Sequence, residues 1–181
     1  MNKSKIRNKI LKLRKNNASK KFKINSDQFL SFLKTNRYNV KNLGGYYPSN
    51  FEIDDLAILE FLEKKNCKIS LPIITKNNQM DFFKWSKNDP LKINKYGIPE
   101  PVSSKIFHPD ILLVPLVSYD NDFNRLGYGG GFYDRYIEKI EKIKKIIKIG
   151  LAFSCQKLKD IPINQYDKKL DFIVTEKEIL K

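Results

Sequence analysis

The residues of this chain best suited to chemistry stand in the stretch from Asn124 to Tyr136. Four of the eight glycines of the chain fall in the five residues Gly127–Gly131. Glycines let a backbone pass close to phosphate oxygens, and the N–H groups that open a helix point toward such an anion. Arg125 and Arg135 can add charge-assisted hydrogen bonds, and Asp134 is placed to bind a metal. The pattern predicts an anion site, although a tight structural turn would require the same glycines.

Two well-known phosphate motifs are excluded in this stretch. A P-loop requires G-x-x-x-x-G-K-[ST], and no Lys-Ser or Lys-Thr follows these glycines. The dinucleotide fingerprint G-x-G-x-x-G fits Gly127 and Gly129, but its third glycine position is Phe132. If the stretch binds an anion, it does so with a loop of another kind.

The elements that must position this loop are a strand before it and a helix after it. Residues 110–115 form a short apolar run typical of a buried strand, and residues 133–147 carry apolar side chains at helical spacing. Strands and helices alternate from about residue 43 onward. We therefore expect one α/β domain over residues 1–181: a Rossmann-like, three-layer α/β/α fold with a largely parallel sheet. Ligands of such sheets bind at the carboxyl ends of the strands, where the glycines lie.

Other elements are predicted from apolar period and capping residues. A basic amphipathic helix should cover residues 3 to about 20, with Ile6, Ile10 and Leu13 inward. Ser26 is the predicted N-cap of a helix over residues 25–34. Ser49 and Glu52 have the spacing of a capping box, which predicts a helix over residues 53–64. Further strands are expected at residues 67–74, 80–85 and 146–153 and near the C-terminus.

The composition allows two explanations of the high positive charge of the chain. The formal charge is +15 with 35 basic residues, which suits a nucleic-acid surface or the attraction of small polyanions. The excess is mostly lysine spread along the whole chain, which also fits a simple compositional bias. Cys67 and Cys155 have no metal-binding spacing and indicate buried thiols in a reducing compartment, and the lone His108 completes no zinc site. With neither a secretory leader nor a membrane span evident, we expect a cytoplasmic protein.

The run Arg-Leu-Gly-Tyr-Gly-Gly-Gly-Phe-Tyr-Asp-Arg-Tyr resembles the signature of the 5-formyltetrahydrofolate cyclo-ligase, or methenyltetrahydrofolate synthetase, family. The family pattern is roughly N-R-L-G-x-G-x-G-[YF]-Y-D-x-[YF]. Lys3 and Arg7 match a K-x-x-x-R element whose basic groups reach ATP phosphates in that family, and Arg14 matches a second, less diagnostic arginine. Glu52 matches a glutamate that contacts the pterin, with Asp55 where the family has threonine.

The resemblance implies a reaction and a set of site residues. ATP phosphorylates the formyl oxygen of 5-formyltetrahydrofolate, N10 attacks the activated carbon, and 5,10-methenyltetrahydrofolate, ADP and phosphate are formed with Mg²⁺ present. The implied ATP site comprises Lys3, Arg7, Arg125, Leu126, Gly127, Gly129, Gly131 and Tyr133. The implied folate site comprises Tyr47, Glu52, Tyr128, Gly129, Gly130, Gly131 and Phe132. Tyr128 and Arg125 are expected as catalytic residues, and the resemblance implies Asp134 with Asp167 as metal ligands. No nucleic-acid partner is implied, and a monomer is expected.

A few further residues remain open between core and site. Met80, Phe82 and Trp85 could wall an aromatic ligand or pack in the core, and Glu100 matches a G-I-x-E-P element of bacterial members of the family. Two rival functions also remain: an RNA-binding protein without catalysis, and a kinase or phosphatase for another small molecule. Neither rival function explains why Glu52, the Lys3/Arg7 pair and the C-terminal tail all occur in one chain.

Overall fold

One mixed sheet organises the protein. The computed structural model describes residues 2–17, 23–38 and 40–181, and its largest sheet has seven strands in the order β11-β10-β9-β6-β1-β2-β3. The strands from β10 to β2 run parallel, and β3 and β11 join the two edges antiparallel. Their bounds are β1 Asn42–Gly44, β2 Lys68–Ile74, β3 Met80–Trp85, β6 Ile111–Pro115, β9 Ile147–Leu151, β10 Phe172–Val174 and β11 Ile179–Leu180.

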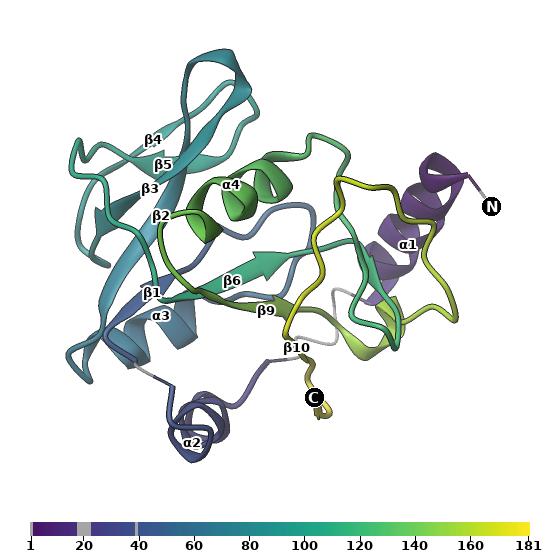
Figure 1. The fold of residues 1–181 in the computed structure, drawn as a ribbon, viewed down its shortest axis with the longest axis horizontal. Coiled ribbons are helices and arrows are strands. Elements are labelled where there is room, and N and C mark those ends of the chain that lie inside the picture. Colours follow the sequence, from purple (N-terminus) through teal and green to yellow (C-terminus); the bar gives the residue numbers. More distant parts are fainter. Residues whose placement is uncertain (1, 18–22, 39) are drawn as a thin grey trace.

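Helices cover both faces of this sheet, as the predicted three-layer α/β/α fold requires (Figure 1). Along β6, Ile111 and Leu113 pack with α2 Ser26–Thr35 and α3 Leu56–Glu63 in one apolar core. The alternate residues Leu112 and Val114 pack with α4 Phe132–Glu141 in the other. Successive side chains of a strand point to opposite faces, so a run that is apolar throughout becomes buried on both.

The helix α1 Lys3–Asn17 lies beyond the carboxyl end of β6 rather than against a face of the sheet (Figure 1). Ile6 and Ile10 bury there against Val117, Leu126 and Ile161. This third core fixes α1 beside the loop that follows β6. The predicted end of this helix, at about residue 20, lies outside the described residues.

Short elements complete the chain. The hairpin β4 Leu91–Ile93 with β5 Pro99–Pro101 and the hairpin β7 Ser118–Tyr119 with β8 Arg125–Leu126 are antiparallel. The second hairpin carries Asp120, which accepts the backbone N–H groups of Asp122 and Asn124 at 3.0 Å each and so acts as a turn former. The 3-10 turns are η2 Lys76–Asn78 and η3 Ser154–Gln156. Among the described residues, no helix combines the length and the apolar character needed to cross a membrane.

Four local predictions are wrong. In α1 the inward position is taken by Arg14 instead of Leu13, which is 37% exposed. The cap of α2 is Asn25, whose side chain accepts the Gln28 N–H at 2.9 Å, and not Ser26. The helix α4 ends at Glu141 because residues from Ile147 onward enter β9. The helix α3 begins at Leu56, three residues after the predicted start, and buries Ile58, Leu59 and Leu62.

Candidate functional site

A cleft of about 1670 Å³ lies at the carboxyl end of the parallel strands. It is larger than the roughly 300–1,000 Å³ that suits one drug-sized ligand, so two ligands can occupy it together. Its walls come from α1, the turn at residues 47–52, the loop between β4 and β5, and the glycine loop at residues 124–131. All the site residues expected from the sequence line it: Lys3, Arg7, Tyr47, Glu52, Arg125, Leu126, Gly127, Tyr128, Gly129, Gly130, Gly131, Phe132, Tyr133, Asp134 and Asp167.

The glycine loop is shaped by two left-handed residues. Gly129 has φ of 103° and Gly131 has φ of 64°, conformations that an L side chain rarely adopts. A Cβ on Gly129 would lie 3.3 Å from Arg7 Cζ, so the bare backbone lets α1 approach. Gly131 is the N-cap of α4, and the first N–H groups of a helix have no partner within it. The loop therefore offers the cleft a free backbone surface and the positive end of a helix dipole.

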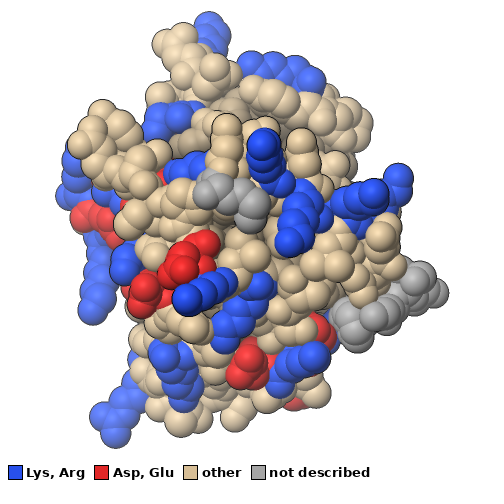
Figure 2. All heavy atoms as spheres, turned by 90° about the vertical axis from the view of Figure 1, so that its right-hand side faces the viewer, with Lys and Arg blue, Asp and Glu red and all other residues tan. Residues whose placement is uncertain are grey.

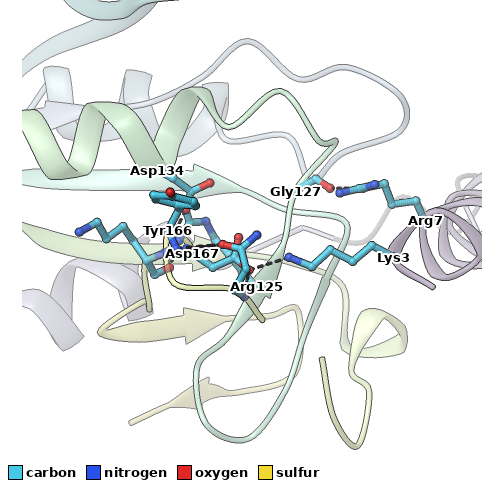
Figure 3. Close-up of polar contacts among 9 residues, drawn as sticks. Lys3, Arg7, Arg125, Gly127, Asp134, Tyr166 and Asp167 are labelled. Atoms are coloured by element: carbon cyan, nitrogen blue, oxygen red, sulfur yellow. Dashed lines mark hydrogen bonds and ion pairs between the residues drawn. The ribbon is translucent and has the colours of Figure 1, made fainter. Parts of the chain in front are cut away.

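Two ion pairs stand side by side in the cleft (Figure 3). Lys3 Nζ lies 2.6 Å from Asp167 Oδ2, and Arg125 Nη2 lies 2.6 Å from Asp134 Oδ1. The same Asp134 oxygen accepts the Lys168 N–H at 3.0 Å, and Arg125 also donates to the Lys168 carbonyl. The C-terminal tail is thus held to the first turn of α4 by the hydrogen bonds of Lys168 with Asp134 and with Arg125.

Arg125 is the buried member of these pairs, with a side chain only 4% exposed. Burial lowers the pKa of Arg125, while the charges of Asp134 and Asp167 act in the opposite direction. An arginine beside two carboxylates remains cationic, so it can donate to a phosphate. Arg7 faces the same space from α1 and donates from Nε to the Gly127 carbonyl at 2.8 Å (Figure 3).

Asp134 and Asp167 are the acidic residues that the family resemblance assigns to a metal. Among the described residues, no group of three or more His, Cys, Asp or Glu side chains is arranged to hold a metal ion. Mg²⁺ does not need such a group, since it usually binds one or two carboxylates together with substrate phosphates and water. Two carboxylates in a cleft that also contains Lys3, Arg7 and Arg125, whose side chains can bind phosphate, therefore fit Mg²⁺.

Glu52 reaches the cleft from a turn and not from a helix cap. Its Oε2 accepts the Ser49 N–H at 2.7 Å and the Ser49 hydroxyl at 3.2 Å, so one of the two contacts expected of a capping box exists. It closes a turn in which Asn50 and Phe51 have φ of 47° and 60°, and α3 begins only after Asp55. Burial raises the pKa of Glu52, and the Ser49 N–H, Tyr128 and Arg14 oppose the shift.

The structure sorts the residues that the sequence left open. Met80 lines the cleft, whereas Phe82 and Trp85 are buried in the two cores of the sheet. Glu100 lies outside the cleft lining and pairs with Lys92 at 3.6 Å. Met80 and Phe82 point to the same face of β3 and share one core, and Met80, the first residue of the strand, is the one that also borders the cleft. Trp85 points to the opposite face and packs in the other core.

Two wall segments were missed by the sequence interpretation. Asn77, Asn78 and Gln79 line the cleft from the connection between β2 and β3, and Tyr96 lines it from the loop between β4 and β5. The Tyr96 ring meets Phe132 edge-on, with centroids 5.9 Å apart. The only signal for them was turn chemistry, such as the Tyr96-Gly97 pair, and turn signals do not say which side of the molecule a loop will reach.

Comparisons with known proteins agree with this architecture. The family model described as the 5-formyltetrahydrofolate cyclo-ligase family matches residues 1–176. The 5-formyltetrahydrofolate cyclo-ligase of Haemophilus influenzae is 34% identical over 138 residues, which cover 72% of this chain and 73% of that protein. The Escherichia coli protein of the same name is 28% identical over 135 residues, 71% of this chain and 74% of its own.

Two solved structures resemble the whole chain. The 5,10-methenyltetrahydrofolate synthetase of Aquifex aeolicus superposes with a TM-score of 0.79 at 30% identity, covering 99% of this chain and 92% of that one. The 5,10-methenyltetrahydrofolate synthetase of Mycoplasma pneumoniae gives a TM-score of 0.72 at 26% identity, covering 97% and 99%. The similarity therefore extends over α1 and the C-terminal tail, which both border the cleft.

Proposed function

This chain belongs to the 5-formyltetrahydrofolate cyclo-ligase family, and from that premise we propose how its residues carry out the reaction. The enzyme converts 5-formyltetrahydrofolate to 5,10-methenyltetrahydrofolate with consumption of ATP. The formyl oxygen is amide-like and leaves poorly, so ATP phosphorylates it, N10 attacks the carbon, and phosphate departs. The observation that supports this assignment most is the convergence of cations, carboxylates and free backbone N–H groups on one cleft large enough for both ligands.

ATP is assigned to the end of the cleft formed by α1 and the glycine loop. Lys3, Arg7 and Arg125 supply three cations there, and the backbone from Leu126 to Gly131 and Tyr133 supplies close contacts. In phosphoryl transfer the protein contributes mainly positioning and charge stabilisation. Arg125 lies within hydrogen-bond reach of Asp134, next to the loop that must hold the transferring phosphate, and it is the residue we assign to the developing negative charge.

The folate is assigned to the part of the cleft between the 47–52 turn and the glycine loop. Glu52 and Tyr47 approach from the 47–52 turn and Tyr128 to Phe132 from the glycine loop. Glu52 accepts both hydrogen bonds from Ser49 with Oε2 and also interacts with the Tyr128 hydroxyl, and we assign its carboxylate to the N–H groups of a pterin, which would take the place of Tyr128. Tyr128 is assigned to the formyl group, where its hydroxyl can donate to the oxygen that receives the phosphate.

Asp134 and Asp167 are proposed to hold Mg²⁺ together with ATP. When bound, the ion supplies positive charge that neutralises the phosphate oxygens. In the free protein both carboxylates are paired with Arg125 and Lys3, so ligand binding must exchange these partners. Calorimetry of ATP binding at increasing Mg²⁺ tests this assignment: Asp134→Asn and Asp167→Asn should need more Mg²⁺, and the exposed Asp122→Asn should match wild type. Unchanged Mg²⁺ dependence in both site variants would remove them as ligands.

Glu52→Gln tests the folate assignment. The variant keeps the shape of the side chain but loses a charged acceptor, and a hydrogen bond to a charged group contributes about 1.5–3 kcal/mol. Folate affinity should therefore fall by about 10- to 100-fold while ATP affinity is unchanged. Glu63→Gln, the same change in α3 away from the cleft lining, is the control. Folate affinity equal in the two variants would leave Glu52 with its turn-forming role only.

The proposal also extends to where and how the enzyme works. The described part of a single chain supplies every wall of the cleft, which supports a monomer, and we propose that it acts in the cytoplasm on small folates. Nucleic acid is not among its proposed partners. On the face that carries α1, basic side chains are scattered among acidic and uncharged residues and form no continuous stripe (Figure 2), unlike the clustered footprint of nucleic-acid-binding domains.

A further inference from the structure

Arg14 is the most deeply buried basic residue of the described chain, although its neighbours in α1 face solvent. Its residue exposure is 1%, while Leu13 is 37% exposed. A guanidinium is rarely buried so fully unless its donors are satisfied and its charge is needed. Arg14 Nε is buried and has no hydrogen-bond partner among the described residues. A buried guanidinium with one unsatisfied donor is unfavourable for stability, so its presence indicates a role beyond the packing of α1.

The guanidinium joins three segments that are far apart in sequence. Arg14 Nη1 donates to the Leu116 carbonyl at 3.2 Å, just past β6. Arg14 Nη2 donates to the Asn50 carbonyl at 2.6 Å and also to the Tyr128 hydroxyl. All three acceptors are neutral oxygens. One side chain of α1 therefore ties the end of a central strand to the 47–52 turn and to the glycine loop.

The contact with Tyr128 has a chemical consequence. The guanidinium only donates, so the Tyr128 oxygen accepts from it and the phenolic proton must point elsewhere. The guanidinium carbon also lies 5.6 Å from the centre of the Tyr128 ring, which holds the ring as well as the hydroxyl. Glu52 is the charged acceptor nearby, and its carboxylate acts electrostatically on Tyr128. A ligand oxygen that enters the cleft can replace Glu52 as the acceptor of the hydrogen bond from the Tyr128 hydroxyl.

The contact with Asn50 stabilises a turn that is unfavourable by itself. Asn50 and Phe51 both have positive φ; Asn tolerates this region, but for a residue such as phenylalanine it costs about 1–2 kcal/mol. The bond from Arg14 to the Asn50 carbonyl fastens this turn where it presents Glu52 and Tyr47 to the cleft. Arg14 thus holds the 47–52 turn and Tyr128 together through one side chain.

We propose that Arg14 is a positioning residue of the folate subsite, which sets Tyr128 and the 47–52 turn at the spacing that the pterin and formyl group require. The proposal rests on the proposed function, because it assumes that folate lies between these walls. It separates two roles within α1: Lys3 and Arg7 serve the nucleotide, and Arg14, two turns farther along, serves the folate. Misplacing a reacting group by about 1 Å can cost about 100-fold in rate.

The test compares Arg14→Met with the control Lys15→Met. Lys15 is the next residue of α1 and is exposed, so its replacement removes one positive charge without touching the buried contacts of Arg14. Arg14→Met should lower kcat/KM for 5-formyltetrahydrofolate by about 100-fold and leave the KM for ATP near its wild-type value. Direct binding of 5-formyltetrahydrofolate, followed by calorimetry without ATP, should weaken in parallel. Lys15→Met should match wild type in both. A folate KM equal in the two variants, or an equal rise in both KM values, would overturn the proposal.

Two further variants keep the result decisive. If Arg14→Met does not fold, Arg14→Lys retains the charge with fewer donors, and a folded Arg14→Lys with wild-type folate affinity also overturns the proposal. In a Tyr128→Phe background Arg14→Met should cost much less than it does alone, because residues that act through one contact are not additive. Full additivity counts against it. Absence of turnover by wild type would instead contradict the proposed function, so the two failures are distinguishable.

Discussion

Gly127 and Gly129 should respond to alanine with opposite signs. Gly129 has φ of 103° and a Cβ there would lie 3.3 Å from Arg7 Cζ, so Gly129→Ala must strain the backbone or displace the arginine. Strain of this kind costs about 1–3 kcal/mol. Gly127 lies outside the left-handed region, and nothing in the described chain lies within 4 Å of its added Cβ. Gly127→Ala should stabilise the protein by about 0.4–1 kcal/mol, because it restricts the unfolded chain.

Thermal unfolding of the ligand-free variants measures the difference. For a protein of this size 1 kcal/mol shifts Tm by about 2–4 °C. Gly129→Ala should therefore unfold about 2–12 °C below wild type and Gly127→Ala about 1–4 °C above it. Since the arginine beside Gly129 is assigned to ATP, Gly129→Ala should also raise the KM for ATP.

A Tm for Gly129→Ala equal to or above that of Gly127→Ala would refute this reasoning. The pair is well matched, because both substitutions add one methyl group to the same loop and differ only in backbone conformation and in the approach of α1. The result would then show that the glycine loop does not hold the conformation described here.

Three other properties of the described residues can be measured directly. Asp134→Asn should lower the free energy of unfolding in urea by about 2 kcal/mol, because a buried Arg125 loses its charged partner but keeps an acceptor; an unchanged midpoint would mean that the pair adds nothing. Burial raises the pKa of Asp55 well above its usual value, opposed by the Tyr46 N–H, so folding takes up a proton there. The free energy of unfolding of the wild type should therefore decline relative to that of Asp55→Asn as pH rises from about 4 toward the raised pKa. Urea unfolding that gives the same difference between the two proteins at pH 4 and at pH 7 would contradict this. Burial also raises the pKa of the Cys67 thiol to about 12, so mass spectrometry should find Cys67 unalkylated by iodoacetamide at pH 8 in native protein and alkylated in guanidinium chloride.

The sequence predicted the parts of this molecule that depend on local pattern. The strand predicted at residues 110–115 is observed as β6 Ile111–Pro115, because the run from residue 111 onward has no polar side chain and must bury both faces. The order of strand, glycine loop and helix was also predictable, since glycines permit the turn and the apolar period of α4 is strong. These elements place the glycine loop at the carboxyl end of β6, where a ligand of a parallel sheet is expected.

The start of α3 could not be predicted from its capping residues. Glu52 Oε2 accepts the Ser49 N–H in this turn, as it would at a helix start, so this bond does not distinguish the two. The reciprocal bond of a capping box is missing, because the Glu52 N–H donates to the Ser49 carbonyl and the Ser49 hydroxyl donates to Glu52. The deciding factor is the positive φ of Asn50 and Phe51, which a helix excludes. That conformation depends on contacts such as the one from Arg14, which is 36 residues away.

The burial of Arg14 shows a second limit. Leu13 and Arg14 both lie near the apolar stripe of α1, and hydrophobicity alone favours burial of the leucine. Arg14 is inward because the carbonyls of Leu116 and Asn50 and the Tyr128 hydroxyl are assembled around it by the fold. Acceptors supplied by distant segments leave no trace in the local sequence.

The reaction itself is best tested by near-ultraviolet absorbance of purified protein mixed with 5-formyltetrahydrofolate, ATP and Mg²⁺. The band of methenyltetrahydrofolate should grow only when ATP is present, and one phosphate should be released for each product molecule formed. The same mixture containing Glu52→Gln, Arg125→Met or Asp134→Asn should show a much slower rise. No band from wild-type protein shown to be folded would contradict the cyclo-ligase reaction in this cleft.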